Sequence, residues 1–306
     1  MMAPIKPLKL PLAASQVDRS AHLRSDEGYL KSAWSSALVI TFMDEKFATS
    51  GDQLSLVTGA TLGEYQSQSD YFLGIKDEQA FFVRHLPLEE GSKLELKTLR
   101  EIGVHLSPRD IGLSVHAQGL ANWHTKHPRC AQCGAATTVI SGGSVRRCLI
   151  DQSEHYPRTD GAVIVLVKDD QDRVLLGRQK VWPKYRFSTF AGFVEPGESF
   201  EHCVVREVKE EAGVDLGEIN YLGSQPWPFP ASLMIAFEAL TNTPQLARPD
   251  GQEIEEIRWF SRAEMKAAIL DKSLILPLEI SVARQMIKAW YGQGAEVDLI
   301  GSESWR

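Results

Sequence analysis

The sequence predicts an α+β protein whose C-terminal half forms an α/β/α sandwich around a mixed sheet. Three observations lead to this fold class. A buried-strand run at residues 161–167 is followed by further strand-like runs that alternate with helical patterns. Three cysteines are grouped just ahead of this run. The chain has 306 residues, which is enough for two domains with a small insert between them.

Composition shifts along the chain set the expected boundaries. We expect a smaller N-terminal α+β domain over residues 1–125, a cysteine-bearing insert over 126–157, the sandwich domain over 158–293 and a tail over 294–306. The chain is 43% hydrophobic and 24% charged, and no apolar run approaches the length of a membrane span. A net charge of −7 argues against broad nucleic-acid binding through bulk electrostatics.

The N-terminal domain combines strand-like runs with a closing helix. The runs at 36–42 and 79–84 are rich in β-branched and aromatic residues. The helix begins at Ser107, a capping residue followed by proline, and Asp110 completes a capping box. An apolar stripe then predicts core packing by Leu113, Ala117, Leu120 and Trp123.

Three of the four cysteines stand close together in the insert. Cys130, Cys133 and Cys148 have the spacing of a metal knuckle, which indicates a zinc-ribbon-like segment and a reduced cytoplasm. They supply three ligands of a tetrahedral structural zinc, and Asp151 stands where a fourth cysteine is expected. Other candidates for the fourth ligand are Glu154, His155, His124 and His127. A ribbon that has lost its metal is the alternative interpretation.

The sandwich domain opens with the run at 161–167. Further strands are expected at 173–176, 187–190, 232–237 and 257–260, with a closing helix over 279–290. Strands interspersed with two or three helices favour a mixed sheet between helical layers.

An acidic helix is expected among these strands. Pro196 and Gly197 form a turn, Ser199 caps the helix, and Gly213 stands where a left-handed residue would end it. At about 100° per residue, one arc carries Val204, Val205, Val208 and Ala212, and the next arc carries Glu207, Glu210 and Glu211.

The three carboxylates repel one another in an ordinary helix. Crowded oxygen ligands of this kind suit Mg²⁺ or Mn²⁺, whereas the plainer interpretation is a solvated acidic face. The segment from Gly192 to Val214 also fits G-x5-E-x7-R-E-U-x-E-E-x-G-U, where U is a bulky aliphatic residue, at each fixed position. This is the signature of the Nudix hydrolases, which split diphosphates with bound divalent metal, and the chain resembles them.

A second string narrows the resemblance. Residues 225–232, Gln-Pro-Trp-Pro-Phe-Pro-Ala-Ser, resemble the specificity array of the NADH pyrophosphatases, also described as NAD-capped RNA hydrolases. The approach Trp123-His124-x2-His127-x2-Cys130 is similar to the same subfamily. Rigid exposed aromatic side chains suit stacking on a flat base, although such a run can also be a packed edge loop. The resemblance covers roughly Trp123 to Ala283.

The resemblance implies hydrolysis of NAD(H) to AMP and nicotinamide mononucleotide, or removal of NAD caps from RNA, by a homodimer. It implies that the substrate contacts Tyr156, Gln225, Pro226, Trp227, Pro228, Phe229, Pro230, Ala231, Ser232 and Ala283. The implied ligands of Mg²⁺ or Mn²⁺ are Glu207, Glu211, the backbone carbonyl of Ala191 and Glu253, with Glu256 as the fallback for Glu253.

The remaining charged residues of the motif receive supporting roles. Glu210 is a candidate general base, and Arg206 and Glu198 would hold the loop and the helix in register. Two other functions stay open. The chain could hydrolyse another diphosphate such as ADP-ribose, or it could be a non-catalytic nucleotide sensor or RNA-binding adaptor. The intact glutamates count against the sensor.

Overall fold

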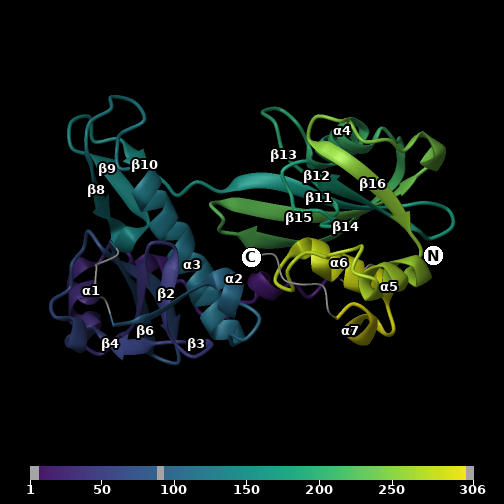
Figure 1. The fold of residues 1–306 in the computed structure, drawn as a ribbon. Helices are drawn as coiled ribbons and strands as arrows, with labels where there is room; N and C mark the ends of the chain where they lie inside the picture. Colours follow the sequence, from purple (N-terminus) through teal and green to yellow (C-terminus); the bar gives the residue numbers. More distant parts are fainter. Residues whose placement is uncertain (1–6, 88–92, 301–306) are drawn as a thin grey trace, which may run out of the picture. The chain divides into compact units, whose positions relative to one another are not determined.

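The computed structural model describes residues 7–87 and 93–300. It contains two compact units (Figure 1). Of the described residues, 7–11, 160–225 and 232–300 form the C-terminal unit, and 12–87, 93–159 and 226–231 form the N-terminal unit. The first residues of the expected N-terminal domain (1–6) and the end of the expected tail (301–306) lie outside the described residues.

A six-stranded mixed sheet forms the centre of the C-terminal unit. Its strands run in the order β14-β15-β11-β12-β16, and β13 also pairs with β11. Strand β11 is parallel to β15 and antiparallel to β12 and β13. The elements of this unit are β11 (Asp160–Lys168), β12 (Val174–Gln179), β13 (Phe190–Phe193), α4 (Phe200–Ala212), β14 (Leu216–Trp227), β15 (Ser232–Thr241), β16 (Ile254–Phe260), α5 (Arg262–Leu270), α6 (Val282–Tyr291) and α7 (Ala295–Asp298).

Helices cover both faces of this sheet, so the predicted α/β/α sandwich is confirmed. Successive side chains of β11 point to opposite faces. Val163 and Val165 pack in a cluster with Val204 and Val208 of α4. On the other face, side chains of β11 pack with residues of α5 and α6, among them Ile164, Leu166, Met265 and Met286. Figure 1 shows α4 on one side of the sheet and α5 and α6 on the other.

The N-terminal unit contains a seven-stranded and a three-stranded sheet. The larger sheet has the order β3-β2-β1-β6-β5, with β4 on β1 and β7 on β2, and β1 is parallel to β6. The smaller sheet has the order β10-β9-β8. The elements are α1 (Glu27–Trp34), β1 (Leu38–Met43), β2 (Lys46–Ser50), β3 (Gln53–Leu54), β4 (Leu56–Thr58), β5 (Asp70–Lys76), β6 (Gln79–Leu86), β7 (Glu95–Thr98), α2 (Leu99–Ile102), α3 (Pro108–Lys126), β8 (Thr137–Ile140), β9 (Val145–Cys148) and β10 (Glu154–His155).

Helix α3 packs against strands β1, β5 and β6 of the larger sheet. The hydroxyl of Ser107 accepts a hydrogen bond from the N–H of Asp110, as expected of the capping residue. The predicted apolar stripe is confirmed as core, because its four residues Leu113, Ala117, Leu120 and Trp123 are all buried. The same helix also buries polar side chains.

The expected strands of the sandwich domain form, with one shift and one omission. The run at 187–190 was expected to be a strand, but β13 begins only at Phe190, and Ser188 makes an isolated bridge with Gly177. Strand β14 was not anticipated, because most of its residues are half-exposed or exposed and give no buried-strand run. Among the described residues, none of the helices has both the length and the apolar character that a membrane crossing requires.

Candidate active site

Helix α4 begins and ends as its sequence predicts. The hydroxyl of Ser199 accepts a hydrogen bond from the N–H of His202 at 3.2 Å, and Gly213 has a φ of 72° at the C-terminal end. Val204, Val208 and Ala212 are fully buried. Val205, which lies on the same predicted arc, is 43% exposed. The helix is therefore held by a narrower apolar stripe than predicted.

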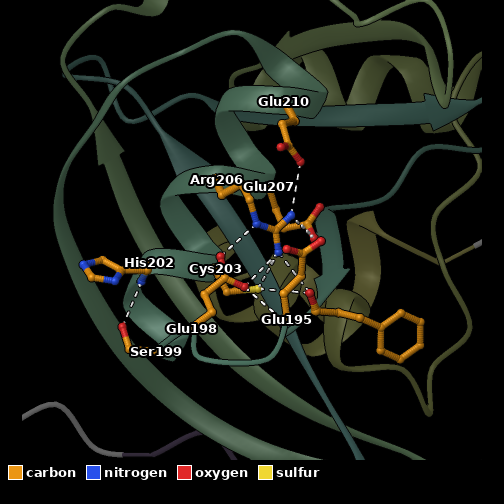
Figure 2. A network of polar contacts seen from close by, with 9 residues as sticks. Glu195, Glu198, Ser199, His202, Cys203, Arg206, Glu207 and Glu210 are labelled. Carbon is orange, nitrogen blue, oxygen red and sulfur yellow. Dashed lines mark hydrogen bonds and ion pairs between the residues drawn. The ribbon is translucent and has the colours of Figure 1, made fainter.

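Arg206 joins the acidic helix to the loop before it (Figure 2). Its Nε and Nη2 donate to the two carboxylate oxygens of Glu198 at 2.8 and 2.9 Å, and Nη1 donates to Glu207 at 2.8 Å and to Glu210 at 3.1 Å. Nη2 also donates to the carbonyl of Phe193 at 3.0 Å. Its hydrogen bonds hold the pKa of Glu198 at about 2. The structure thus brings these charged residues of the motif together.

Glu207 packs directly over Gly192. A Cβ atom at position 192 would lie 1.8 Å from Cδ of Glu207, a separation that van der Waals contact forbids. A larger residue there would displace the Glu207 carboxylate, since the backbone of β13 passes under it. Burial raises the pKa of Glu207, and the hydrogen bond from Arg206 opposes this rise.

Glu211 is the most buried carboxylate of α4. It is 5% exposed, and its Oε2 has no hydrogen-bond partner among the described residues. The backbone N–H of Ala191 donates to its carboxylate. Burial, followed by the negative charges of Glu253 and Glu207, raises the pKa of Glu211 to about 8. An unpartnered oxygen among like charges is the environment that a bound cation would stabilise.

Glu253 is the downstream glutamate that lies near these helix carboxylates. Its charge raises the pKa of both Glu207 and Glu211, and its Oε1 accepts a hydrogen bond from Nε2 of Gln179 at 2.7 Å. Asp250 also raises the pKa of Glu211 and accepts the backbone N–H of Glu253. Sequence reasoning missed Asp250, although the Asp-Gly pair at 250–251 is a turn signal.

The fallback residue, Glu256, has different neighbours. Its Oε1 accepts a hydrogen bond from Nε of Arg258 at 2.8 Å, and its Oε2 lies 3.5 Å from Nε of Arg178. It therefore pairs with cations of the protein, whereas Glu253 faces other carboxylates. The hard oxygen donors of Glu207, Glu211 and Glu253 fit a divalent cation such as Mg²⁺ or Mn²⁺.

The residues of the proline-aromatic array fall into both units. Gln225 belongs to the C-terminal unit, is fully buried and donates from Nε2 to the carbonyl of Ile280 at 2.9 Å. Residues 226–231 belong to the N-terminal unit. The rings of Trp227 and Phe229 lie 4.8 Å apart at 66°.

A cation of the same unit lies over these two rings. The guanidinium carbon of Arg100 is 4.3 Å from the centroid of Phe229 and 5.5 Å from that of Trp227. Sequence reasoning missed Arg100, because more than 120 residues separate it from the array and no local pattern marks it.

The two outlying substrate candidates differ in exposure. Tyr156 is 64% exposed, and its hydroxyl donates to Glu154 at 2.9 Å. Ala283 is a buried residue of α6 and belongs to the apolar cluster on that face of the sheet. Ser232 begins β15. Substrate contact by these residues stays a prediction.

The three cysteines of the insert and Asp151 form one cluster. One ligand atom from each of Cys130, Cys133, Cys148 and Asp151 lies within 4.8 Å of the others. Three sulfur atoms and one carboxylate oxygen suit a tetrahedral zinc ion. The residues around the cluster therefore fit the metal that the cysteine spacing predicts.

The other candidates for the fourth ligand have other partners. Nε2 of His155 lies 3.2 Å from the Ser153 hydroxyl, and His155 is also within hydrogen-bonding reach of Cys130. The ring of His124 bonds the carbonyl of Gly143 and the guanidinium of Arg146. The ring of His127 lies within hydrogen-bonding distance of the Trp123 carbonyl, and Glu154 accepts a hydrogen bond from Arg147.

Known proteins resemble both the sandwich and the insert. The NUDIX domain family matches residues 157–277, and the NADH pyrophosphatase zinc ribbon domain matches residues 126–156. The NAD-capped RNA hydrolase NudC of Mycobacterium bovis (strain BCG / Pasteur 1173P2) is 36% identical over 287 residues, covering 89% of this chain and 92% of that protein. The same values hold for the NudC of Mycobacterium tuberculosis (strain ATCC 25618 / H37Rv). The NAD-capped RNA hydrolase NUDT12 of Homo sapiens is 37% identical over 199 residues, covering 61% of this chain and 43% of that protein.

Proposed function

The chain belongs to the Nudix hydrolases, and we propose that it hydrolyses the pyrophosphate bond of NAD(H), releasing AMP and nicotinamide mononucleotide. The same reaction on the 5′ end of an NAD-capped RNA would remove the cap. The observation that carries this proposal is the combination of a buried glutamate cluster on α4 with the array at 225–232 in one chain. The relatives named NAD-capped RNA hydrolase, which align over most of the chain, support it.

The glutamate cluster would hold Mg²⁺ or Mn²⁺. Glu207, Glu211 and Glu253 provide carboxylate oxygens, and the backbone carbonyl of Ala191 is a fourth donor by family resemblance. A divalent ion bound there supplies positive charge for the pyrophosphate and lowers the pKa of a coordinated water molecule. The unpartnered Oε2 of Glu211 supports this assignment.

The chain's own residues position this cluster and handle the proton. Arg206 holds Glu207 against Gly192, and Glu198 holds Arg206 in turn. Both therefore act on the reaction through Glu207. The side chain of Glu210 is 60% exposed on α4, where it is the candidate to accept a proton from the attacking water.

The array would recognise the dinucleotide. The half-buried rings of Trp227 and Phe229, with Arg100 beside them, would stack on a base or nicotinamide ring, and Tyr156 offers an exposed ring. The other expected contacts are Gln225, Pro226, Pro228, Pro230, Ala231, Ser232 and Ala283. Because the chain carries a net charge of −7, recognition of a capped RNA would depend on its cap more than on its phosphates.

Cys130, Cys133, Cys148 and Asp151 would bind a structural zinc ion. Reduced thiols suit the cytoplasm, which we propose as the location. A homodimer is proposed from the family resemblance. The proposed domains remain residues 1–125, 126–157, 158–293 and 294–306, and the zinc ribbon match at 126–156 supports the second of them.

The test is a hydrolysis assay with Mg²⁺ or Mn²⁺ on NADH, ADP-ribose and an NAD-capped RNA. We expect the two NAD substrates to give the highest kcat/KM, and Glu211→Gln to lower it about a hundredfold or more. A higher kcat/KM for ADP-ribose than for either NAD substrate would make ADP-ribose the substrate in place of NAD(H). A protein that binds these nucleotides and turns over none of them would be a sensor.

A further inference from the structure

Helix α3 buries a stripe of polar side chains. Ser114, Gln118 and Asn122 follow one another at intervals of four residues, so they lie on one face of the helix. They are 0%, 1% and 5% exposed. Buried polar groups destabilise a fold unless they form hydrogen bonds, so a buried amide pair in a helix requires an explanation.

Two of these side chains bind the backbone of the array. Nε2 of Gln118 and Nδ2 of Asn122 both donate to the carbonyl of Pro228, at 2.9 and 3.0 Å. Nδ2 of Asn122 also lies 3.2 Å from the carbonyl of Pro230. All of these residues belong to the N-terminal unit. The third member of the stripe, Ser114, has no partner for its hydroxyl among the described residues.

The array needs such donors because of its composition. Proline has no N–H, so the three prolines at 226, 228 and 230 remove donors with which this loop could pair its own carbonyls. Pro228 is buried, away from the water that would otherwise satisfy its carbonyl. The amides of α3 supply the missing donors.

The hydrogen-bonded carbonyls flank an aromatic residue. Phe229 lies between Pro228 and Pro230, and Trp227 precedes them. Each peptide plane is rigid, so holding the 228–229 peptide directly before Phe229 and the 230–231 peptide one residue beyond it restricts the direction in which its side chain leaves the backbone. The ring of Trp227 packs on that of Phe229, and the same restriction therefore reaches both rings.

We propose that Gln118 and Asn122 are positioning residues that hold the aromatic array in the orientation that binds the dinucleotide. This inference rests on the proposed function, in which the array recognises NAD(H). Among the described residues, neither amide hydrogen-bonds a glutamate of α4. The amides therefore affect the affinity for substrate and leave the rate of the chemical step unchanged. A preorganised loop binds more tightly because it loses less conformational entropy on binding.

The test compares Gln118→Leu, Asn122→Leu and the isosteric Asn122→Asp with the wild-type protein. Ser114→Ala is the matched control, because it alters the same buried stripe without removing a donor to the loop. Thermal unfolding selects the variants that remain folded. We expect each amide variant to raise KM for NADH about tenfold, with kcat within about twofold of wild type.

A double-mutant cycle separates positioning from general destabilisation. Asn122→Leu in a Phe229→Ala background should add little to KM, because the ring that Asn122 positions is already absent. Wild-type KM in folded Gln118→Leu and Asn122→Leu proteins would overturn this inference alone. Full additivity in the cycle would overturn it as well. A wild-type protein that neither binds nor hydrolyses NADH would overturn the proposed function together with the inference.

Discussion

Replacing Glu211 with glutamine should change how the stability of the metal-free protein depends on pH. The wild-type side chain is 5% exposed, and burial with neighbouring carboxylates raises its pKa from 4.5 to about 8. Because the folded-state pKa is raised, the protonated side chain favours folding below about pH 4.5. This stabilisation is lost as the pH rises through 8. The difference in pKa corresponds to roughly 4 to 5 kcal/mol in the free energy of unfolding.

Urea unfolding in EDTA, at several values between about pH 5 and about pH 9, measures this effect. The wild-type free energy of unfolding should fall across this range. Glu211→Gln has no ionisable group at that position, so its curve should be flatter and should lie above that of wild type at the alkaline end. Glu210→Gln is the matched control, because its side chain on the same helix is 60% exposed.

Parallel curves for the wild-type and Glu211→Gln proteins would refute this reasoning, since burial would then carry no electrostatic cost. Added Mg²⁺ gives a second check. It should stabilise the wild-type protein at about pH 8, where Glu211 ionises, and stabilise the variant much less. Equal stabilisation of both proteins would remove Glu211 from the ligand set.

Three further changes test other parts of the molecule. Gly192→Ala places a Cβ 1.8 Å from Cδ of Glu207, so kcat should fall about tenfold or more in a folded protein, and unchanged kcat would show that the carboxylate moves freely. Asp151→Ala should lower the zinc content per chain, measured by elemental analysis, whereas His155→Ala should keep it; the opposite result would reassign the fourth ligand. Trp227→Ala should raise KM for NADH about tenfold, and an unchanged KM would make the array simple packing.

Local spacing predicted the helix and its charged face well. The cap at Ser199 and the left-handed Gly213 follow from their residue types, and the buried Val204 and Val208 follow from periodicity. Val205 lies on the predicted arc but is 43% exposed, because a period of 100° per residue does not reveal how wide a strip of the helix the sheet covers. The shifted start of β13 has a similar cause, since a short apolar run does not show which of its residues pair.

Contacts between segments that are far apart in the chain could mostly not be predicted from the sequence. Glu253 was found through the resemblance, but Asp250 beside it was not, because its effect on Glu211 depends on the folding of a turn. The membership of residues 226–231 in the N-terminal unit was also unforeseen. The donors Gln118 and Asn122 stand more than 100 residues from the loop that they hold, and no local pattern joins them.

The hydrogen bonds of Arg206 bear on how the proposed metal site would receive a pyrophosphate. Its guanidinium is bound to Glu198, Glu207 and Glu210 and to the carbonyl of Phe193, so its donors are committed to the protein itself. The surrounding carboxylates then leave an excess of negative charge, which repels a pyrophosphate. A divalent cation held by the proposed ligands would offset this charge, so pyrophosphate binding should tighten as the free Mg²⁺ or Mn²⁺ concentration rises.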